Sequence, residues 1–312
     1  MKVSIILPTY NRASMLNKAI DSTLNQTFKD FELIIVDNYS TDNTESVVKS
    51  YDDKRISYFK NQNNGLVSIN RNYGIQKSCG EYIAFLDDDD LWLPEKLEKQ
   101  VKLLDSNKKL GLVYSRSYVI DDRGNPAKPT YFRGIKLRRG HVFNELLVSN
   151  FIPQLTVLTR RDALDKVGKF DLQYKIAQDY DLWLRIANHY TVDFIDQPLA
   201  KYRFHKESES YLNPERSSIE TQWMLLKFME LYPNFDKLYY KEFIELKYYP
   251  QYYFALIDWK QGNNHLVRER LKPFLLLKFR AIIPFIFSFF PYAFYNSLYV
   301  LFNKHIRRIP TY

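Results

Sequence analysis

Short apolar runs alternate with helical patterns through the first 90 residues, and this alternation constrains the fold more than any other feature. The runs cover residues 3–8, 31–37, 56–59 and 82–86, a length typical of buried strands. Strands separated by helices predict an α/β domain with a largely parallel sheet. We expect three intervening helices. The first lies within 11–26, the second follows a capping box formed by Asp42 and Glu45, and the third covers 68–78.

Polar residues follow three of these four strands at the point where each strand ends. They are Pro8–Arg12, Asp37 and the carboxylates Asp87–Asp90. In open α/β sheets, ligands bind outside the carboxyl ends of the strands. The strand pattern alone therefore predicts that these three clusters meet at one rim and form a ligand site.

The remainder of the chain continues the domain and then becomes helical. We expect a helix from 94 to about 105, a strand at 110–120, a turn at 121–126, a helix at 179–189 and a strand at 192–195. Residues 219–260 have a helical pattern that is rich in Tyr and Phe.

Residues 281–303 contain no charged side chain and lie between two groups of basic residues. A membrane-spanning helix needs about 20 apolar residues, so this length is only just sufficient. Pro284 and Pro291 argue against one straight span, and basic residues on both sides favour a segment that lies on an anionic leaflet. Docking against the protein and a true span are the alternatives.

Composition narrows the function classes. The 46% of hydrophobic residues is ample for a folded core, and the net charge of +9 suits an anionic partner. The basic residues form no recognisable nucleic-acid module, so nucleic acid is not an expected partner. The single cysteine, Cys79, excludes an internal disulfide and a zinc cluster; we expect it to be buried, and the protein to be cytoplasmic.

The four carboxylates Asp87–Asp90 repel one another and stay ionised only beside a cation. Oxygen ligands and phosphate oxygens suit Mg²⁺ or Mn²⁺. If the segment is extended, alternate side chains face the same way, so Asp87 and Asp89 would share a metal while Asp88 faces elsewhere. A solvated acidic turn is the alternative.

Other polar residues fit a nucleotide ligand. Tyr10 can stack on a base, Asp37 can accept from a base or a ribose, and Arg71 offers a planar donor fork to a diphosphate. Asp179, at the start of a helix, can take a proton from an acceptor hydroxyl or simply cap that helix. His205 can be a late metal or phosphate ligand, although an isolated histidine is often neither.

Six stretches in this order resemble the family 2 glycosyltransferases, which have the GT-A fold, and the resemblance covers residues 1–210. They are VSIILPTYNR (3–12), LIIVDNYSTDNT (33–44), NNGLVSINRN (63–72), GEYIAFLDDDDLWLPEKL (80–97), QDYDLWLR (178–185) and YRFHKES (202–208). The resemblance implies a GT-A catalytic domain at 1–215, with a nucleotide-sugar half at 1–110 and an acceptor half at 111–215. A helical extension at 216–312 would contain the membrane-associating segment 281–303.

The resemblance also implies roles for single residues. Asp179 would be the catalytic base of an inverting transfer, and Asp89 the direct ligand of Mn²⁺ or Mg²⁺, with Asp87 and His205 near it. The residues expected to bind the nucleotide sugar are Pro8, Thr9, Tyr10, Asn11, Arg12, Asp37, Asn38, Arg71, Asp87 and Asp88. Two departures affect this transfer of roles. The family often has Asp-Asp-Gly-Ser where this chain has Asp37-Asn38-Tyr39-Ser40, and Glu-Asp where it has Gln178-Asp179.

The expected function is therefore metal-assisted transfer of a sugar, in a single displacement, from a nucleotide diphosphate to a hydroxyl of a glycan or lipid-linked acceptor. A UDP-sugar is the first choice of donor. The expected location is the inner face of the cell membrane, as a peripheral protein. A nucleotidyltransferase and a non-catalytic, membrane-associated nucleotide-sugar-binding protein are the alternatives.

Overall fold

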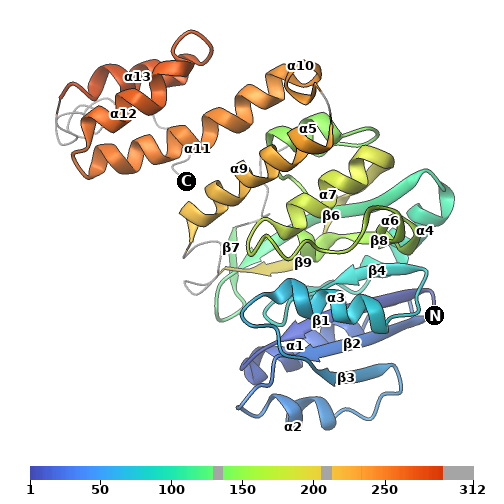
Figure 1. Cartoon of the computed structure of the whole chain (residues 1–312). Helices are drawn as coiled ribbons and strands as arrows, with labels where there is room; N and C mark the ends of the chain where they lie inside the picture. Colours follow the sequence, from blue (N-terminus) through green and yellow to red (C-terminus); the bar gives the residue numbers. More distant parts are fainter. Residues whose placement is uncertain (129–135, 205–212, 233, 291–312) are drawn as a thin grey trace. The chain divides into compact units, whose positions relative to one another are not determined.

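The computed structural model describes residues 1–128, 136–204, 213–232 and 234–290. The chain divides into two compact units, Met1–Leu212 and Asn213–Tyr312 (Figure 1). The first unit contains a mixed sheet with helices on its faces, which confirms the expected α/β class. Assignment of separate donor and acceptor halves within it stays a prediction.

The four strands expected in the first 90 residues form one parallel block. They are β1 (Val3–Thr9), β2 (Phe31–Asp37), β3 (Ile56–Lys60) and β4 (Tyr82–Phe85), and they lie in the order β3-β2-β1-β4. The crossovers carry α1 (Ala13–Leu24), α2 (Thr44–Lys49) and α3 (Val67–Lys77). This arrangement brings the ends of β1, β2 and β4 to one edge, as predicted.

Antiparallel pairing begins beyond β4, where the sheet continues with β8 (Leu158–Arg160), β6 (Leu110–Ile120), β9 (Thr191–Arg203) and β5 (Leu91–Trp92). β4 pairs with β8, β8 with β6, and β5 with β9 in antiparallel fashion, whereas β6 and β9 run parallel. A short β7 (Pro126–Lys128) adds to β6 after the expected turn.

The expected strand at 192–195 is part of a much longer one. β9 continues to Arg203 because β6 offers it a partner along the whole length. Pro198 cannot donate to a ladder, and the register between the two strands shifts on both sides of its partner Arg116. The strand-like alternation of the sequence ends near this irregularity, whereas the strand itself continues to Arg203.

The remaining helices of the first unit pack around this sheet. They are α4 (Lys96–Ser106), α5 (Phe143–Val148), α6 (Arg161–Val167) and α7 (Gln178–His189), with a 3₁₀ turn, η1 (Gln154–Thr156). Apart from α4 and α7, these elements have at most seven residues. Such short elements carry too few apolar positions to show a periodic pattern, so the sequence did not predict them.

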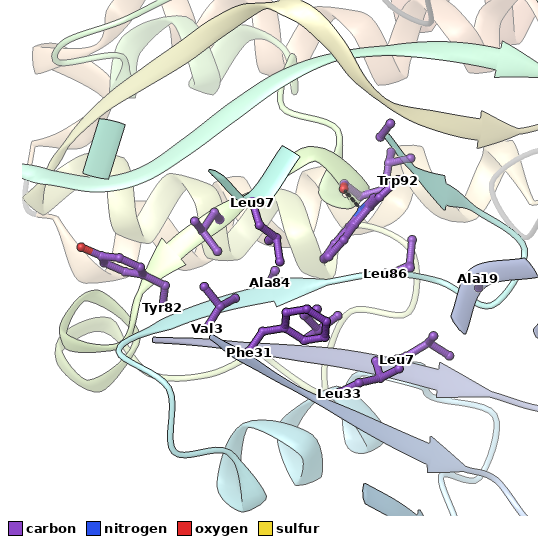
Figure 2. Close-up of a cluster of buried hydrophobic side chains, with 14 of the residues drawn as sticks. Val3, Leu7, Ala19, Phe31, Leu33, Tyr82, Ala84, Leu86, Trp92 and Leu97 are labelled. Atoms are coloured by element: carbon purple, nitrogen blue, oxygen red, sulfur yellow. Dashed lines mark hydrogen bonds between the residues drawn. The ribbon is translucent and has the colours of Figure 1, made fainter. Parts of the chain in front are cut away.

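The core under the rim joins both parts of the sheet, and Figure 2 shows part of it. Val3 and Leu7 of β1 cluster with Ala19 of α1, and Trp92 of β5 lies in the same cluster. The indole Nε1 of Trp92 donates to the carbonyl oxygen of Leu155 at 2.8 Å, so this buried N–H is satisfied. Immediately after the acidic residues, the chain is thus anchored deep in the core.

α3 covers the face of β1 that is opposite to this core cluster. A Cβ built on Gly74 would lie 2.5 Å from Cγ2 of Ile6, so only glycine allows this helix to lie so close to the strand. This close approach helps to hold α3, which carries Arg71, against the sheet.

Two local expectations were wrong. Asp42 accepts from the N–H of Thr44 and from that of Ala13, not from Glu45, whose carboxylate pairs with Lys49 and Lys60. Cys79 is exposed rather than buried, because it lies just beyond α3 where the backbone turns toward β4.

The second unit is helical. It contains α9 (Pro214–Leu231), α10 (Phe235–Leu238), α11 (Tyr240–Lys260), α12 (Asn264–Leu271), η2 (Lys272–Phe274) and α13 (Phe279–Phe287). Helices α9, α10 and α11 cover most of residues 219–260, where a helical pattern was expected, and the left-handed backbone of Asn234 (φ 61°) lies between α9 and α10. Tyr248, Trp259 and Val267 belong to its core cluster, to which α11, α12, η2 and α13 contribute.

Among the described residues, no helix combines the length and the apolar character that crossing a membrane requires. α13 covers the first part of the apolar segment expected to associate with the membrane, and 291–303 lie outside the described residues.

Candidate active site

The loop after β1 and the acidic residues after β4 contact each other directly. Thr9 Oγ1 donates to Asp88 Oδ2 at 2.8 Å, and the Tyr10 N–H lies 3.3 Å from the same oxygen. One nitrogen of Arg12, Nη1, lies 3.0 Å from Asp88 Oδ1 and 2.6 Å from Asp89 Oδ2. Two of the three predicted clusters therefore share one hydrogen-bond network.

Asp37, the third predicted cluster, is connected to this network through Ser40 and Asn11. Its Oδ1 accepts from the N–H and the hydroxyl of Ser40, and its Oδ2 accepts from Tyr58 Oη at 2.5 Å. Ser40 Oγ in turn accepts from the Asn11 N–H at 2.8 Å. Because Asp37 is fully buried, these donors hold its carboxylate in place behind the rim. The convergence predicted from the strand pattern is confirmed.

Tyr39, where the family often has Gly, has a backbone conformation that favours glycine. Tyr39 has a φ of 56°, in the left-handed region that glycine adopts without cost. Its side chain is exposed, as is that of Tyr10 on the neighbouring loop. Asn38 points elsewhere, since its Oδ1 accepts from the Asn63 N–H at 2.9 Å.

Residues Asp87–Asp90 form a turn, closed by the Asp90 N–H donating to the Asp87 carbonyl oxygen at 3.1 Å. The alternation expected for an extended segment was therefore wrong. Asp88 and Asp89 face the same arginine, Arg12, while Asp87 accepts from a different one, Arg71 Nη2, at 2.6 Å.

Arginine side chains supply the cations that this acidic turn requires. Asp90 is buried and accepts from the Arg203 N–H at 2.8 Å, and Arg203 Nε donates to the Asp89 carbonyl oxygen. Burial raises the pKa of Asp90 well above its usual range. Burial, followed by the charge of Asp89, raises the pKa of Asp88 to about 6, against the opposing effect of Arg12.

Arg71 lies at the centre of the site and is 3% exposed. Nη2 binds Asp87, whereas Nε and Nη1 have no hydrogen-bond partner among the described residues. Asn72 fixes this part of α3, because its side-chain amide exchanges two hydrogen bonds with the backbone of Phe170. Buried N–H groups of a cation are costly to leave unpaired, and the ring of Phe170, 5.7 Å from the guanidinium carbon, gives this cation an aromatic neighbour.

Asp179 begins the first turn of α7 and lies within electrostatic reach of Arg71. Burial raises its pKa to about 6, although the Tyr180 N–H and the charge of Arg71 oppose the shift. Asn150 Nδ2 lies 3.5 Å from Asp179 Oδ2. A carboxylate with a pKa near neutrality is a suitable general base. Gln178 is buried, and its amide donates to the Lys175 carbonyl oxygen, so it helps to shape the start of the helix.

A divalent cation fits the chemistry of the acidic turn, although no group of three metal-ligating side chains exists among the described residues. Magnesium-type sites often use one or two carboxylates and complete the shell with substrate phosphates and water. Arg12 already places a positive charge between Asp88 and Asp89 and neutralises these two carboxylates in this structure. His205 lies outside the described residues, so its role stays a prediction.

Four residues of the site were absent from the sequence interpretation: Ser40, Tyr58, Asn150 and Arg203. Ser40 and Arg203 belonged to stretches already singled out, and the capping of Asp37 by Ser40 is a local pattern that could have been detected. Tyr58, Asn150 and Arg203 act through contacts between residues 21 to 113 positions apart, which no local pattern reveals.

Comparison with known proteins decides the class of the protein. The profile of glycosyl transferase family 2 matches residues 4–168, more than half of the chain. The chain belongs to glycosyltransferase family 2. This glycosyltransferase is 39% identical over 220 residues to an uncharacterised glycosyltransferase of Methanocaldococcus jannaschii, covering 68% of this chain and 73% of that protein. It spans only 31% to 64% of the lengths of several Rickettsia relatives.

A second relative has a defined activity in its name. It is the UDP-Glc:α-D-GlcNAc-diphosphoundecaprenol β-1,3-glucosyltransferase of Escherichia coli, 29% identical over 224 residues, with 72% of this chain and 85% of that protein covered. Together with the family match, this similarity confirms the expectation of a transferase enzyme.

Solved structures confirm the GT-A fold. Staphylococcus aureus TarS in complex with UDP-GlcNAc has a TM-score of 0.66 and 18% identity, covering 87% of this glycosyltransferase and 81% of that chain. The mannosyltransferase PcManGT of Pyrobaculum calidifontis, in complex with GDP-Man and Mn²⁺, has a TM-score of 0.62 and 18% identity. Its match covers 89% of this chain and 76% of that one.

Proposed function

We propose that this glycosyltransferase inverts the anomeric carbon as it moves a sugar from a nucleotide diphosphate to an acceptor hydroxyl. The observation that carries the proposal is the position of Arg71. Its guanidinium binds Asp87 at 2.6 Å, retains two unpaired nitrogens, and lies close enough to Asp179 to affect its pKa. The proposed diphosphate-binding cation therefore lies within electrostatic reach of the proposed base.

In the proposed mechanism, the loop of Thr9, Tyr10 and Asn11 holds the nucleoside, and Asp37 supports this loop from behind through Ser40. Arg71, whose Nε and Nη1 are buried without a hydrogen-bond partner in this structure, would donate to the diphosphate once donor binding uncovers them. A divalent cation held by Asp89 and Asp87 would supply Lewis-acid assistance to the leaving group. Asp179 accepts the proton of the acceptor hydroxyl as the oxygen attacks the anomeric carbon, and the bond to the nucleotide diphosphate breaks on the opposite side.

We also propose a UDP-sugar donor and a lipid-linked acceptor. The E. coli relative is named for a UDP-glucose donor and a diphosphoundecaprenol acceptor, and TarS was solved with UDP-GlcNAc. The fold itself does not select a substrate. These assignments therefore rest on similarity and on the basic character of the chain, whose net charge is +9.

A panel of nucleotide sugars tests the function directly. Purified protein is incubated with each nucleotide sugar, Mn²⁺ and an undecaprenyl-diphosphate-linked acceptor, and the released nucleoside diphosphate is measured. We expect release with one or a few UDP-sugars and sugar transfer to the acceptor. Release of inorganic pyrophosphate from a nucleoside triphosphate would indicate a nucleotidyltransferase. Tight donor binding without product across the panel would indicate a binding protein.

The second unit carries a surface that suits an anionic membrane. Leu276 is fully exposed, and Ile283 and Ile286 of α13 are also exposed. Lys272 and Arg280 are exposed basic residues of the same segment. Exposed apolar side chains beside cations are typical of segments that lie in the membrane interface. We propose that this surface brings the enzyme to a membrane-bound acceptor.

Substitution of these three apolar residues tests the membrane proposal without removing the core of the unit. The triple variant Leu276→Ser, Ile283→Ser, Ile286→Ser is expected to bind anionic vesicles at least about tenfold more weakly, because each buried apolar side chain contributes roughly 1.5–3 kcal/mol. Vesicle flotation measures the effect. Leu238→Ser, at an equally exposed position on α10, is the control and should bind like the parent. Equal binding by the triple variant would contradict the proposal.

A further inference from the structure

Arg12 pairs with Asp89, a carboxylate that the proposed function assigns to the metal ion, and with its neighbour Asp88. A single nitrogen, Nη1, contacts Asp88 Oδ1 at 3.0 Å and Asp89 Oδ2 at 2.6 Å. The second of these distances is short for an N–H to a carboxylate and indicates a strong charge-assisted bond. The guanidinium thus serves both carboxylates at once.

The carboxylates are fixed more firmly than the arginine. Asp88 is held by Thr9 Oγ1 and by the Tyr10 N–H, and the backbone of Asp89 accepts from Arg203 Nε. The side chains of Asp88 and Asp89 are 6% and 13% exposed, whereas that of Arg12 is 34% exposed. Arg12 is therefore the member of this cluster that can leave without rearranging the backbone.

Arg12 and a divalent ion cannot both hold the same oxygen of Asp89. At about 4 Å, a unit charge and a divalent charge repel by roughly twice the energy of two unit charges, even in a water-like medium. A metal ion that takes Asp89 must therefore displace the guanidinium. Nucleotide phosphates offer a new partner to a displaced arginine, because guanidinium groups bind phosphate oxygens in a fork geometry.

We propose that Arg12 is the resident counter-cation of the acidic turn and exchanges places with the metal when the donor binds. This inference rests on the proposed metal-assisted function. Without donor, Arg12 neutralises Asp88 and Asp89 and competes with free metal ions. With donor, the diphosphate takes up Arg12, so metal and nucleotide bind cooperatively. The arrangement makes Mn²⁺ alone a weak ligand and Mn²⁺ with a nucleoside diphosphate a strong one.

Mn²⁺ binding by Arg12→Gln tests this exchange. Gln retains an N–H donor but carries no charge, so the affinity for Mn²⁺ alone should rise roughly tenfold or more. The increase in Mn²⁺ affinity caused by saturating UDP should shrink correspondingly. Electron paramagnetic resonance of free Mn²⁺ measures both without any turnover. Arg12→Lys, which keeps the charge, should bind Mn²⁺ alone much like the parent and provides a second variant if Gln impairs folding.

Thermal unfolding provides an independent measurement and a matched control. Without metal, Arg12→Gln should unfold at a lower temperature than the parent, and Mn²⁺ should raise its Tm more than it raises that of the parent. Arg55→Gln removes a comparable ion pair, with Asp53 at 2.7 Å, far from the acidic turn, so its Tm shift should not depend on Mn²⁺.

Three outcomes separate the proposals. Stronger binding of Mn²⁺ alone by Arg12→Gln supports the exchange. Unchanged or weaker binding by this variant, while the parent still binds Mn²⁺ with UDP, overturns the exchange and leaves the proposed function intact. Absence of Mn²⁺ binding in every protein, with and without UDP, overturns both the exchange and the metal assistance.

Discussion

Asp179→Asn should lower kcat by about 10²–10⁴-fold and leave donor affinity nearly unchanged. The amide has almost the same shape as the carboxylate but cannot accept the proton of the acceptor hydroxyl. Donor binding should persist because Asp179 lies near Arg71 without an ion pair to it, so the fork and the acidic turn remain intact. Sugar transfer and the Kd of the UDP-sugar are measured on the same preparation.

The control for this variant is Asp162→Asn. Asp162 is the second residue of α6, as Asp179 is the second residue of α7, but it is exposed on the surface. The Asp162→Asn variant should transfer sugar at the parent rate. Transfer at that rate by Asp179→Asn would mean that this carboxylate only caps its helix.

The raised pKa of Asp179 makes the same assignment testable by pH. A base acts only when ionised, and burial places the pKa of this carboxyl at about 6. The value of kcat/KM should therefore fall about tenfold per pH unit below about pH 6 and reach a plateau above it. Released nucleoside diphosphate, measured across this range, gives the profile. A plateau that extends down to the ordinary aspartate pKa near 4 would contradict the role.

Asp89→Ala should abolish the dependence of donor binding on Mn²⁺. Loss of residues that merely support a metal ligand costs about 10–100-fold in affinity, so loss of a direct ligand should cost at least about 100-fold. Its carboxylate also holds Arg12, so donor binding without metal is measured alongside to separate the two effects. Asp122→Ala, at an exposed acidic position in the nearby turn, is the control.

Unchanged Mn²⁺-dependent binding by Asp89→Ala would remove this residue from the metal site. Asp87 would then be the first alternative, since its side chain is the more exposed of the two. Because Asp87 also binds Arg71, the variant Asp87→Ala should then weaken donor binding both with and without metal.

Sequence reasoning located the site but described its electrostatics incompletely. The strand ends at Thr9, Asp37 and Phe85 lie together because three parallel strands must end at one edge. The same reasoning assumed an extended acidic segment and a metal ion as its cation. A turn places Asp88 and Asp89 side by side instead, and arginines from α3, β9 and the first loop neutralise the cluster.

Two conclusions followed from the amino-acid sequence by itself: the α/β class and the rim on which Pro8–Arg12, Asp37 and Asp87–Asp90 converge. Each depends on residue type and on spacing within one element or its end. Tertiary structure decided how the charges pair, because Arg12 and Arg71 reach carboxylates 16 to 77 positions away in the chain. Periodic patterns record which face of an element is buried; they hold no information about which distant side chain will lie opposite it.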